Sequence, residues 1–251
     1  PLAGRKYGLD LGTMNIRIFQ GGHGLVVYEK NMIAIQRKKE VAAIGNDAFE
    51  MYERTPASIV ISNPVRDGVI ADVNNMNKVA EALLKKCGCT TGFMRNNSFY
   101  LAVPSDVTEV EKRAYFDLIA HSAYNTHNIF VVEKPLAAAL GENVNVKSKK
   151  GMMIVDMGAG TTEITVITMG GIVVSKLLKV GGNTINASIC QLVKERHHLV
   201  IGDKTAEYLK LELGHAIPGQ GRGKTVFGRD VITGLPSKAE VSDHLVFDSM
   251  K

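Results

Sequence analysis

The sequence has little of several features that would place it in a specialised class. Its 251 residues include three cysteines, Cys87, Cys89 and Cys190, and no tryptophan. Three thiols cannot form a disulfide framework, and one Cys-Gly-Cys run without a second cysteine pair is a poor zinc site, so a reducing cytoplasm fits the chain best. No apolar run approaches the ~20 residues that span a bilayer, and residues 1–6 do not resemble a signal peptide. We therefore expect neither a secreted nor an integral membrane protein.

The charge and composition are those of an ordinary folded protein. The formal net charge is +5, from thirty Lys and Arg against twenty-five Asp and Glu, and the basic residues are scattered among acidic ones. This pattern gives no reason to expect nucleic-acid binding. Apolar residues make up 45% of the chain, and its length suits one large domain or two smaller ones.

The order of apolar runs predicts an α/β fold. Short runs bounded by Gly and Asn are typical of strands, whereas apolar residues at helical spacing predict helices. Strands are expected at about 7–11, 16–19, 25–28, 32–35, 41–44, 99–103, 129–132, 152–155, 163–167 and 172–178, and helices from 74, at 108–123, from 135, at 184–198 and at 205–213. Strands that alternate with helices indicate an α/β sheet.

One short segment occurs twice. Gly8-Leu9-Asp10-Leu11-Gly12-Thr13 recurs as Ile154-Val155-Asp156-Met157-Gly158-Ala159-Gly160-Thr161, and each copy ends an apolar run and precedes another. Two copies of a strand, Asp-x-Gly turn, strand unit predict a duplicated domain. The polar run at 145–150 is the expected hinge between the two copies.

The repeated turn suits phosphate binding. Its glycines let backbone N–H groups approach an anion, and its Thr hydroxyls add donors. Asp10 and Asp156 place one carboxylate in each turn, and a carboxylate pair facing a polyphosphate is a common way to hold Mg²⁺, often through its waters. One copy alone is better explained as a tight hairpin with a capping Asp, but the repetition favours a triphosphate held between two turns.

These turns, with the run Val132-Glu133-Lys134-Pro135-Leu136-Ala137-Ala138-Ala139 between them, resemble the superfamily of actin, sugar kinases and heat-shock chaperone ATPases. Closer still, the chain resembles the MreB family of bacterial actins. The supporting runs lie at 54–56, 66–72, 103–105, 108–114, 201–207 and 228–236. The match covers nearly every expected element.

The resemblance implies an actin-like α/β fold, in which two RNase H-like subdomains flank a nucleotide cleft. The first domain would be residues 1–145 with a small insert at about 25–72, and the second would be residues 146–251 with a small insert at about 216–251. Members of the family continue further, so the second large subdomain is expected to be incomplete here. Either the chain is a fragment, or the natural protein lacks part of its second sheet.

The resemblance also implies a site for ATP or ADP with Mg²⁺. Asp10 and Asp156 would hold the metal through water, and Thr161 would help to position the attacking water. The residues expected to contact the nucleotide are Asp10, Gly12, Thr13, Met14, Asn15, Gly158, Ala159, Gly160, Thr161, Thr162, Gly181, Gly182, Glu207 and Lys210. Without the resemblance, Glu207 and Lys210 fit a surface ion pair equally well, because residues three apart share a helix face.

Lys134 departs from the family pattern. The family's catalytic carboxylate is the Glu before Pro, which accepts a hydrogen bond from the attacking water, and a protonated Lys cannot do so. Glu133 should point to the other side of the chain. We therefore expect bound ATP with weak hydrolysis, as in an MreB paralogue that works in a set. The alternative is that Lys134 extends into solvent and another group orients the water.

The function that the resemblance implies is a nucleotide-regulated filament beneath the membrane, serving cell shape or movement. Its partners would be itself, in double protofilaments, and other MreB paralogues, with no nucleic acid. Phe93 and Met94, near Lys85, Lys86 and Arg95, form an apolar tip expected to touch the inner face of the cell membrane from the cytoplasm, although a packed loop apex explains them equally well.

Two other interpretations compete. A small-molecule kinase or other phosphotransferase of the same superfamily is the alternative function, and it would need a carboxylate base that Lys134 removes. The run 219–225 resembles a phosphate-binding P-loop. However, Pro218 occupies the first required Gly position, and a strand is expected to follow instead of a helix. A flexible turn is the better explanation.

Overall fold

The structure is a computed structural model that describes residues 4–36, 40–89, 97–124, 126–217, 219 and 221–251. The chain divides into two compact units, Pro1–Lys179 and Val180–Lys251. The strands of the first unit are β1 (Lys6–Leu11), β2 (Asn15–Gln20), β3 (Gly24–Lys30), β4 (Ile33–Gln36), β5 (Val41–Ile44), β6 (Ile59–Ser62), β7 (Val65–Arg66), β8 (Val69–Ile70), β9 (Asn97–Val103), β10 (Thr126–Glu133), β11 (Met152–Met157), β12 (Thr162–Thr168) and β13 (Gly171–Leu178). Its helices are α1 (Asn46–Met51), α2 (Val73–Lys86), α3 (Glu109–Ala120) and α4 (Lys134–Gly141).

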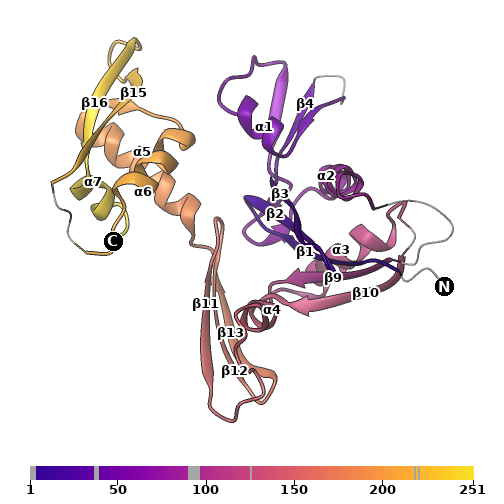
Figure 1. The fold of residues 1–251 in the computed structure, drawn as a ribbon. Helices are drawn as coiled ribbons and strands as arrows, with labels where there is room; N and C mark the ends of the chain where they lie inside the picture. The colour runs from indigo at the N-terminus through magenta and orange to yellow at the C-terminus, as the bar shows by residue number, and fades with distance from the viewer. Residues whose placement is uncertain (1–3, 37–39, 90–96, 125, 218, 220) are drawn as a thin grey trace. The chain divides into compact units, whose positions relative to one another are not determined.

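A five-stranded sheet of order β10-β9-β1-β2-β3 organises the first unit. β1, β2 and β3 form an antiparallel meander, whereas β9 and β10 run parallel to β1. Alternate residues of β1 are buried, among them Tyr7, whose ring stacks on Phe99 of β9 with centroids 5.5 Å apart. The amphipathic helices α2 and α3 add their apolar faces to this core (Figure 1). The predicted α/β sheet is therefore confirmed.

Two helices of this unit, α2 and α3, begin at residues whose side chains cap them. Asp72 accepts a hydrogen bond from the Asn75 N–H at 2.9 Å and starts α2. Thr108 and Glu111 exchange hydrogen bonds in a capping box that starts α3. The sequence predicts a helix to 123, but α3 ends at Ala120.

The expected insert near 25–72 is a small sheet of order β5-β4-β6 with α1 beside it. Its separate core is built on Met32, Ala34 and Ala48. β3 belongs to the main sheet instead, because Gly24–Lys30 pairs along β2. The separate sheet therefore begins at Ile33, later than the sequence suggests.

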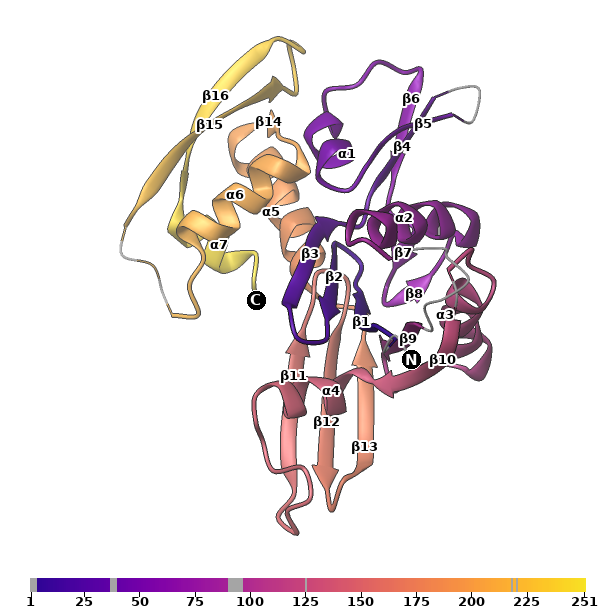
Figure 2. The same cartoon turned by 45° about the vertical axis from the view of Figure 1, so that its right-hand side comes forward.

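A second meander, β11-β12-β13, forms an antiparallel three-stranded sheet with α4 against it (Figure 2). Ala139, Val146 and Ile167 form their common core. The segment expected to be a hinge, 145–150, is tied to this sheet, since Gly170 N–H donates to the Val146 carbonyl at 2.7 Å. This packing explains why the compact unit ends after Lys179, whereas the boundary at 145/146 between two homologous subdomains stays a prediction.

The second unit is a small α/β structure. Its elements are α5 (Gly182–His197), β14 (Leu199–Val200), α6 (Asp203–Leu213), β15 (Gly223–Asp230), β16 (Pro236–Ser242) and α7 (Asp243–Asp248). The three helices and the β14-β15-β16 sheet share a core that includes Ile189, Leu209 and Val241. β15 begins at Gly223, within the P-loop-like run 219–225, so this run leads into a strand and not into a helix, as the sequence predicts.

None of the helices described has both the length and the apolar character needed to cross a bilayer.

Candidate functional site

The two copies of the repeated segment fold into matching turns. In the first turn the Gly12 N–H donates to the Asn15 carbonyl at 3.0 Å, and in the second the Gly158 N–H donates to the Thr161 carbonyl at 2.8 Å. Each turn joins the first two strands of an antiparallel meander, β1 to β2 and β11 to β12. A side chain at Gly12 would come within 2.8 Å of the Asn15 carbonyl oxygen, so this turn requires glycine. The two copies of the repeated segment therefore share a local structure, whereas the duplication of a whole domain stays a prediction.

Both turns line one cavity of about 230 Å³ in the first unit. They also touch each other, because a Cβ built on Gly160 would lie 2.8 Å from Thr13 Oγ1. The sequence-predicted residues that line the cavity are Asp10, Gly12, Thr13, Met14, Asn15, Lys134, Asp156, Gly158, Ala159, Gly160 and Thr161. Thr162, the first residue of β12, is buried and is not part of that lining.

Side chains from distant segments hold the first turn in place. Asn31 Nδ2 donates to the Gly12 carbonyl at 2.8 Å, and Asn63 Nδ2 donates to the Thr13 carbonyl at 3.2 Å. The Gly68 N–H donates to Thr13 Oγ1 at 3.4 Å. The sequence does not predict these three hydrogen bonds, because each joins residues far apart in the chain.

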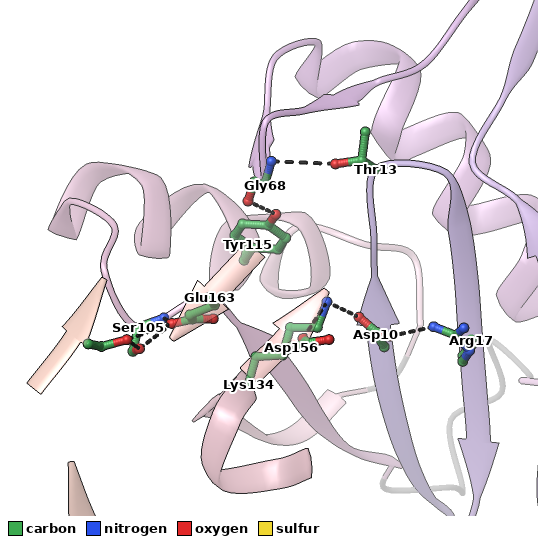
Figure 3. A network of polar contacts seen from close by, with 10 residues as sticks. Asp10, Thr13, Arg17, Gly68, Ser105, Tyr115, Lys134, Asp156 and Glu163 are labelled. Atoms are coloured by element: carbon green, nitrogen blue, oxygen red, sulfur yellow. Dashed lines mark hydrogen bonds and ion pairs between the residues drawn. The ribbon is translucent and has the colours of Figure 1, made fainter. Parts of the chain in front are cut away.

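The cavity wall beside the turns includes Gly68 and Tyr115. Tyr115, which is 1% exposed, donates its hydroxyl to the Gly68 carbonyl at 2.9 Å (Figure 3). Its ring belongs to the main core, so the cavity wall is fixed to the body of the unit.

Lys134 lies between the two turns instead of extending into solvent. It is the first residue of α4, directly after β10. Its Nζ is 3.3 Å from Asp10 Oδ1 and 3.6 Å from Asp156 Oδ2, and Arg17 Nη1 is 3.1 Å from Asp10 Oδ2 (Figure 3). Burial would lower the pKa of Lys134, but the Asp10 and Asp156 carboxylates outweigh burial and raise that pKa above its ordinary value. Lys134 is therefore a cation at neutral pH.

Arg17 and Glu163 occupy equivalent positions in the two meanders. Arg17 pairs with Asp10 across β1 and β2, and Glu163 pairs with Asp156 across β11 and β12. Both line the cavity, and neither is among the site residues predicted from the sequence. The repeat alignment could have found them, because each lies seven residues after the Asp of its turn.

Glu163 is a buried carboxylate, 2% exposed. Its Oε1 accepts hydrogen bonds from the Ser105 N–H at 2.8 Å, from the Ser105 hydroxyl, and from the Ser175 hydroxyl at 3.2 Å (Figure 3). Ser175 also shares a hydrogen bond with Thr165 at 2.6 Å. This network ties the second meander to the segment that follows β9.

The arrangement fits the predicted Mg²⁺ site poorly. Asp10 already meets a cation at each carboxylate oxygen, and Asp156 shares the Lys134 ammonium. Within the described ranges, no group of three or more His, Cys, Asp and Glu side chains is placed to hold a metal ion. The metal role of Asp10 and Asp156 stays a prediction.

The remaining predicted nucleotide contacts lie in the second unit, where they surround the N-terminus of α5. Lys210 Nζ donates to the Gly182 carbonyl at 3.2 Å and lies 3.7 Å from Glu207 Oε2. Glu207 Oε2 also accepts from Asn186 Nδ2 at 3.0 Å. Gly181 is the N-cap of α5. Glu207 and Lys210 are therefore more than a surface ion pair, since both tie α6 to α5.

Phe93 and Met94, the expected membrane contact, lie outside the described residues.

The comparisons with known proteins agree on one family. The MreB/Mbl protein family model matches residues 4–251. The cell shape-determining protein MreB of Escherichia coli is 36% identical over 252 residues, covering 97% of this chain and 71% of that protein. The cell shape-determining protein Mbl of Bacillus cereus is 34% identical over 249 residues, covering 98% of this chain and 74% of that protein.

Solved structures give the same result. MreB5 of Spiroplasma citri bound to ADP superimposes with a TM-score of 0.92 at 31% identity, covering 100% of this chain and 75% of that one. The AMPPNP-bound form of the same protein gives a TM-score of 0.90. The MamK double helical filament, at 20% identity and a TM-score of 0.77, shows the shared fold. The superpositions, together with the two glycine turns on one cavity, show an actin-like α/β fold. The family model and the relatives show that the chain belongs to the MreB/Mbl family of bacterial actins.

Proposed function

We propose that this chain is an ATP-binding subunit of a cytoskeletal filament that serves cell shape or movement. The observation that carries the proposal is the pair of matching glycine turns that line one cavity. Its relatives support it, because they are described as cell shape-determining proteins, as MreB5 bound to AMPPNP or ADP, and as a MamK filament.

The phosphates of ATP or ADP lie between the two turns in this proposal. The backbone of Gly12, Gly158 and Gly160 comes to the surface without side chains, and Thr13 and Thr161 supply hydroxyl donors. Lys134 and Arg17 add positive charge at the same cavity. Gly181, Gly182, Glu207 and Lys210 are the proposed nucleoside contacts.

Hydrolysis is weak in this proposal. A charged ammonium at position 134 donates hydrogen bonds and accepts none, so Lys134 cannot orient the attacking water as a carboxylate does. Glu133 is exposed and does not line the cavity within the part of the chain described. Thr161 contributes a hydroxyl for water positioning, but it lacks a partner base at position 134. The chain is thus an MreB paralogue governed mainly by nucleotide binding.

Assembly follows the family in this proposal. Subunits stack head to tail into double, antiparallel protofilaments, with copies of this chain or with other MreB paralogues, on the cytoplasmic face of the cell membrane. Closure around ATP favours the conformation that fits the next subunit, since a ligand shifts a population only through its differential affinity. Phe93 and Met94 are the proposed membrane contact.

Two assays on the purified chain test the function. Sedimentation and electron microscopy with ATP should give pelletable filaments that need no acceptor substrate. Dependence of ATP turnover on an added sugar, without polymer, would support a kinase instead.

Phosphate release with Mg-ATP on the parent chain and on Lys134→Glu tests the role of Lys134. We expect little release from the parent and a clear gain in the variant. Comparable, robust release from both would show that hydrolysis runs through another residue.

A further inference from the structure

The charges that meet at Lys134 are balanced within the chain itself. Two carboxylates, Asp10 and Asp156, pair with two cations, Lys134 and Arg17, whereas Glu163, the third carboxylate of the lining, is hydrogen-bonded to Ser105 and Ser175. The Lys134 ammonium touches a carboxylate from each of the two turns, and Figure 3 shows its side chain directed toward both. It therefore joins the two carboxylates that the sequence predicts as Mg²⁺ ligands.

We propose that the Lys134 ammonium takes the role of the divalent cation, so that this site binds nucleotide phosphates with little dependence on Mg²⁺. The inference rests on the proposed nucleotide-binding function and deepens it. It also reverses the expectation, drawn from the carboxylate pair alone, that the nucleotide binds as its Mg²⁺ complex.

The position of Lys134 supports its proposed role in place of the divalent cation. Lys134 is anchored at the start of α4, where Pro135 is buried and Ala139 packs into the core shared with β12. Its side chain is 27% exposed, so the ammonium is largely withdrawn from water yet open to the cavity. A compact ammonium is an effective phosphate ligand because it acts as a point charge with three donors.

Charge counting explains why position 134 matters. With Lys134, the four groups Asp10, Asp156, Arg17 and Lys134 carry no net charge, and the third carboxylate of the lining, Glu163, accepts its hydrogen bonds from Ser105 and Ser175. With Glu at this position, the same four positions would hold three carboxylates and one cation, an excess of two negative charges among them. A divalent cation neutralises that excess, whereas here the chain supplies its own positive charge. Removing the Lys134 ammonium would leave the Asp156 carboxylate, and one oxygen of Asp10, without a cation from the described part of the chain. Such an uncompensated negative charge favours the binding of an external cation.

The test is calorimetric titration of ADP, in excess Mg²⁺ and in EDTA without divalent cation. ADP binding does not depend on turnover, so the readout is independent of hydrolysis. For the parent we expect dissociation constants within about threefold of each other in the two buffers. For Lys134→Gln we expect the dissociation constant to be about tenfold or more higher in EDTA than in Mg²⁺. Lys134→Arg should keep the low Mg²⁺ dependence because it keeps the charge.

Lys176→Gln is the matched control. Lys176 is an exposed lysine of the same unit, 3.9 Å from Asp106 and not part of the described cavity lining. Its removal should leave the ratio of the two constants at the parent value. Circular dichroism and thermal unfolding check that each variant is folded, and the parent titrations decide the question by themselves if Lys134→Gln does not fold.

A parent chain that binds ADP in Mg²⁺ but about tenfold or more weakly in EDTA would overturn the inference while leaving the proposed function intact. A parent chain that binds ADP in neither buffer would refute the proposed function, and the inference with it.

Discussion

Gly160→Ala tests the contact between the two turns directly. The new Cβ would lie 2.8 Å from Thr13 Oγ1, 3.0 Å from its Cγ2 and 3.2 Å from its Cβ. Contacts below 3.0 Å force atoms to move, and Thr13 is not free to rotate without losing the hydrogen bond from the Gly68 N–H. Overpacking of this kind typically costs about 1–3 kcal/mol. We expect the free energy of unfolding to fall by that amount.

The assay is urea unfolding of the parent and of Gly160→Ala, with Gly151→Ala as the matched control. A Cβ on Gly151 would meet Val166 Cγ1 at 3.7 Å, an ordinary van der Waals contact. The control should therefore change the free energy of unfolding by no more than about 0.5 kcal/mol.

A double-mutant cycle separates this clash from other effects. Thr13→Ala removes the two closest atoms, so in that background Gly160→Ala should cost about 1 kcal/mol less than in the parent. Equal unfolding free energies for Gly160→Ala and Gly151→Ala, or equal costs in both backgrounds, would refute the claim that the two turns touch.

Three further predictions follow from the buried groups of the first unit. Glu163→Ala leaves the Ser105 N–H without its acceptor, although the Ser105 hydroxyl can still donate to Ser175 Oγ at 2.8 Å, and should lower the free energy of unfolding by about 1–3 kcal/mol in urea, whereas no loss would show that the network adds nothing. Asn31→Ala removes the donor to the Gly12 carbonyl and should cost about 1 kcal/mol and weaken ADP binding in calorimetry; unchanged affinity would show that the turn needs no such support. Burial raises the pKa of Cys89 to about 12, so its alkylation by iodoacetamide at neutral pH, followed by mass spectrometry, should be far slower in the native chain than in urea, and equal rates would contradict the burial.

The sequence predicts the local features of the fold well. The strand pairs around Asp10 and Asp156 lie where the apolar runs indicate, and α3 begins at Glu109, one residue after the predicted start at 108. The repeat predicts the two matching turns because their glycines are required by local backbone contacts. Such signals are encoded within a few residues, so a single sequence carries them.

Contacts and strand pairings between segments far apart in the chain could not be predicted from the sequence. Asn31 and Asn63 hold the first turn from loops with no pattern of their own. β3 is exposed on one face and looks like the start of an insert, yet its pairing with β2 places it in the main sheet. The position of Lys134 between two carboxylates follows from packing of α4 against β11 and β12, which no local spacing reveals.

The most direct measurement of the central claim is amide hydrogen exchange of the chain with and without ATP. If the two turns hold the phosphates, exchange should slow in both 10–15 and 156–162 when ATP is added, because bound donors are protected from solvent. Exchange that stays unchanged in both segments at saturating ATP would contradict the account.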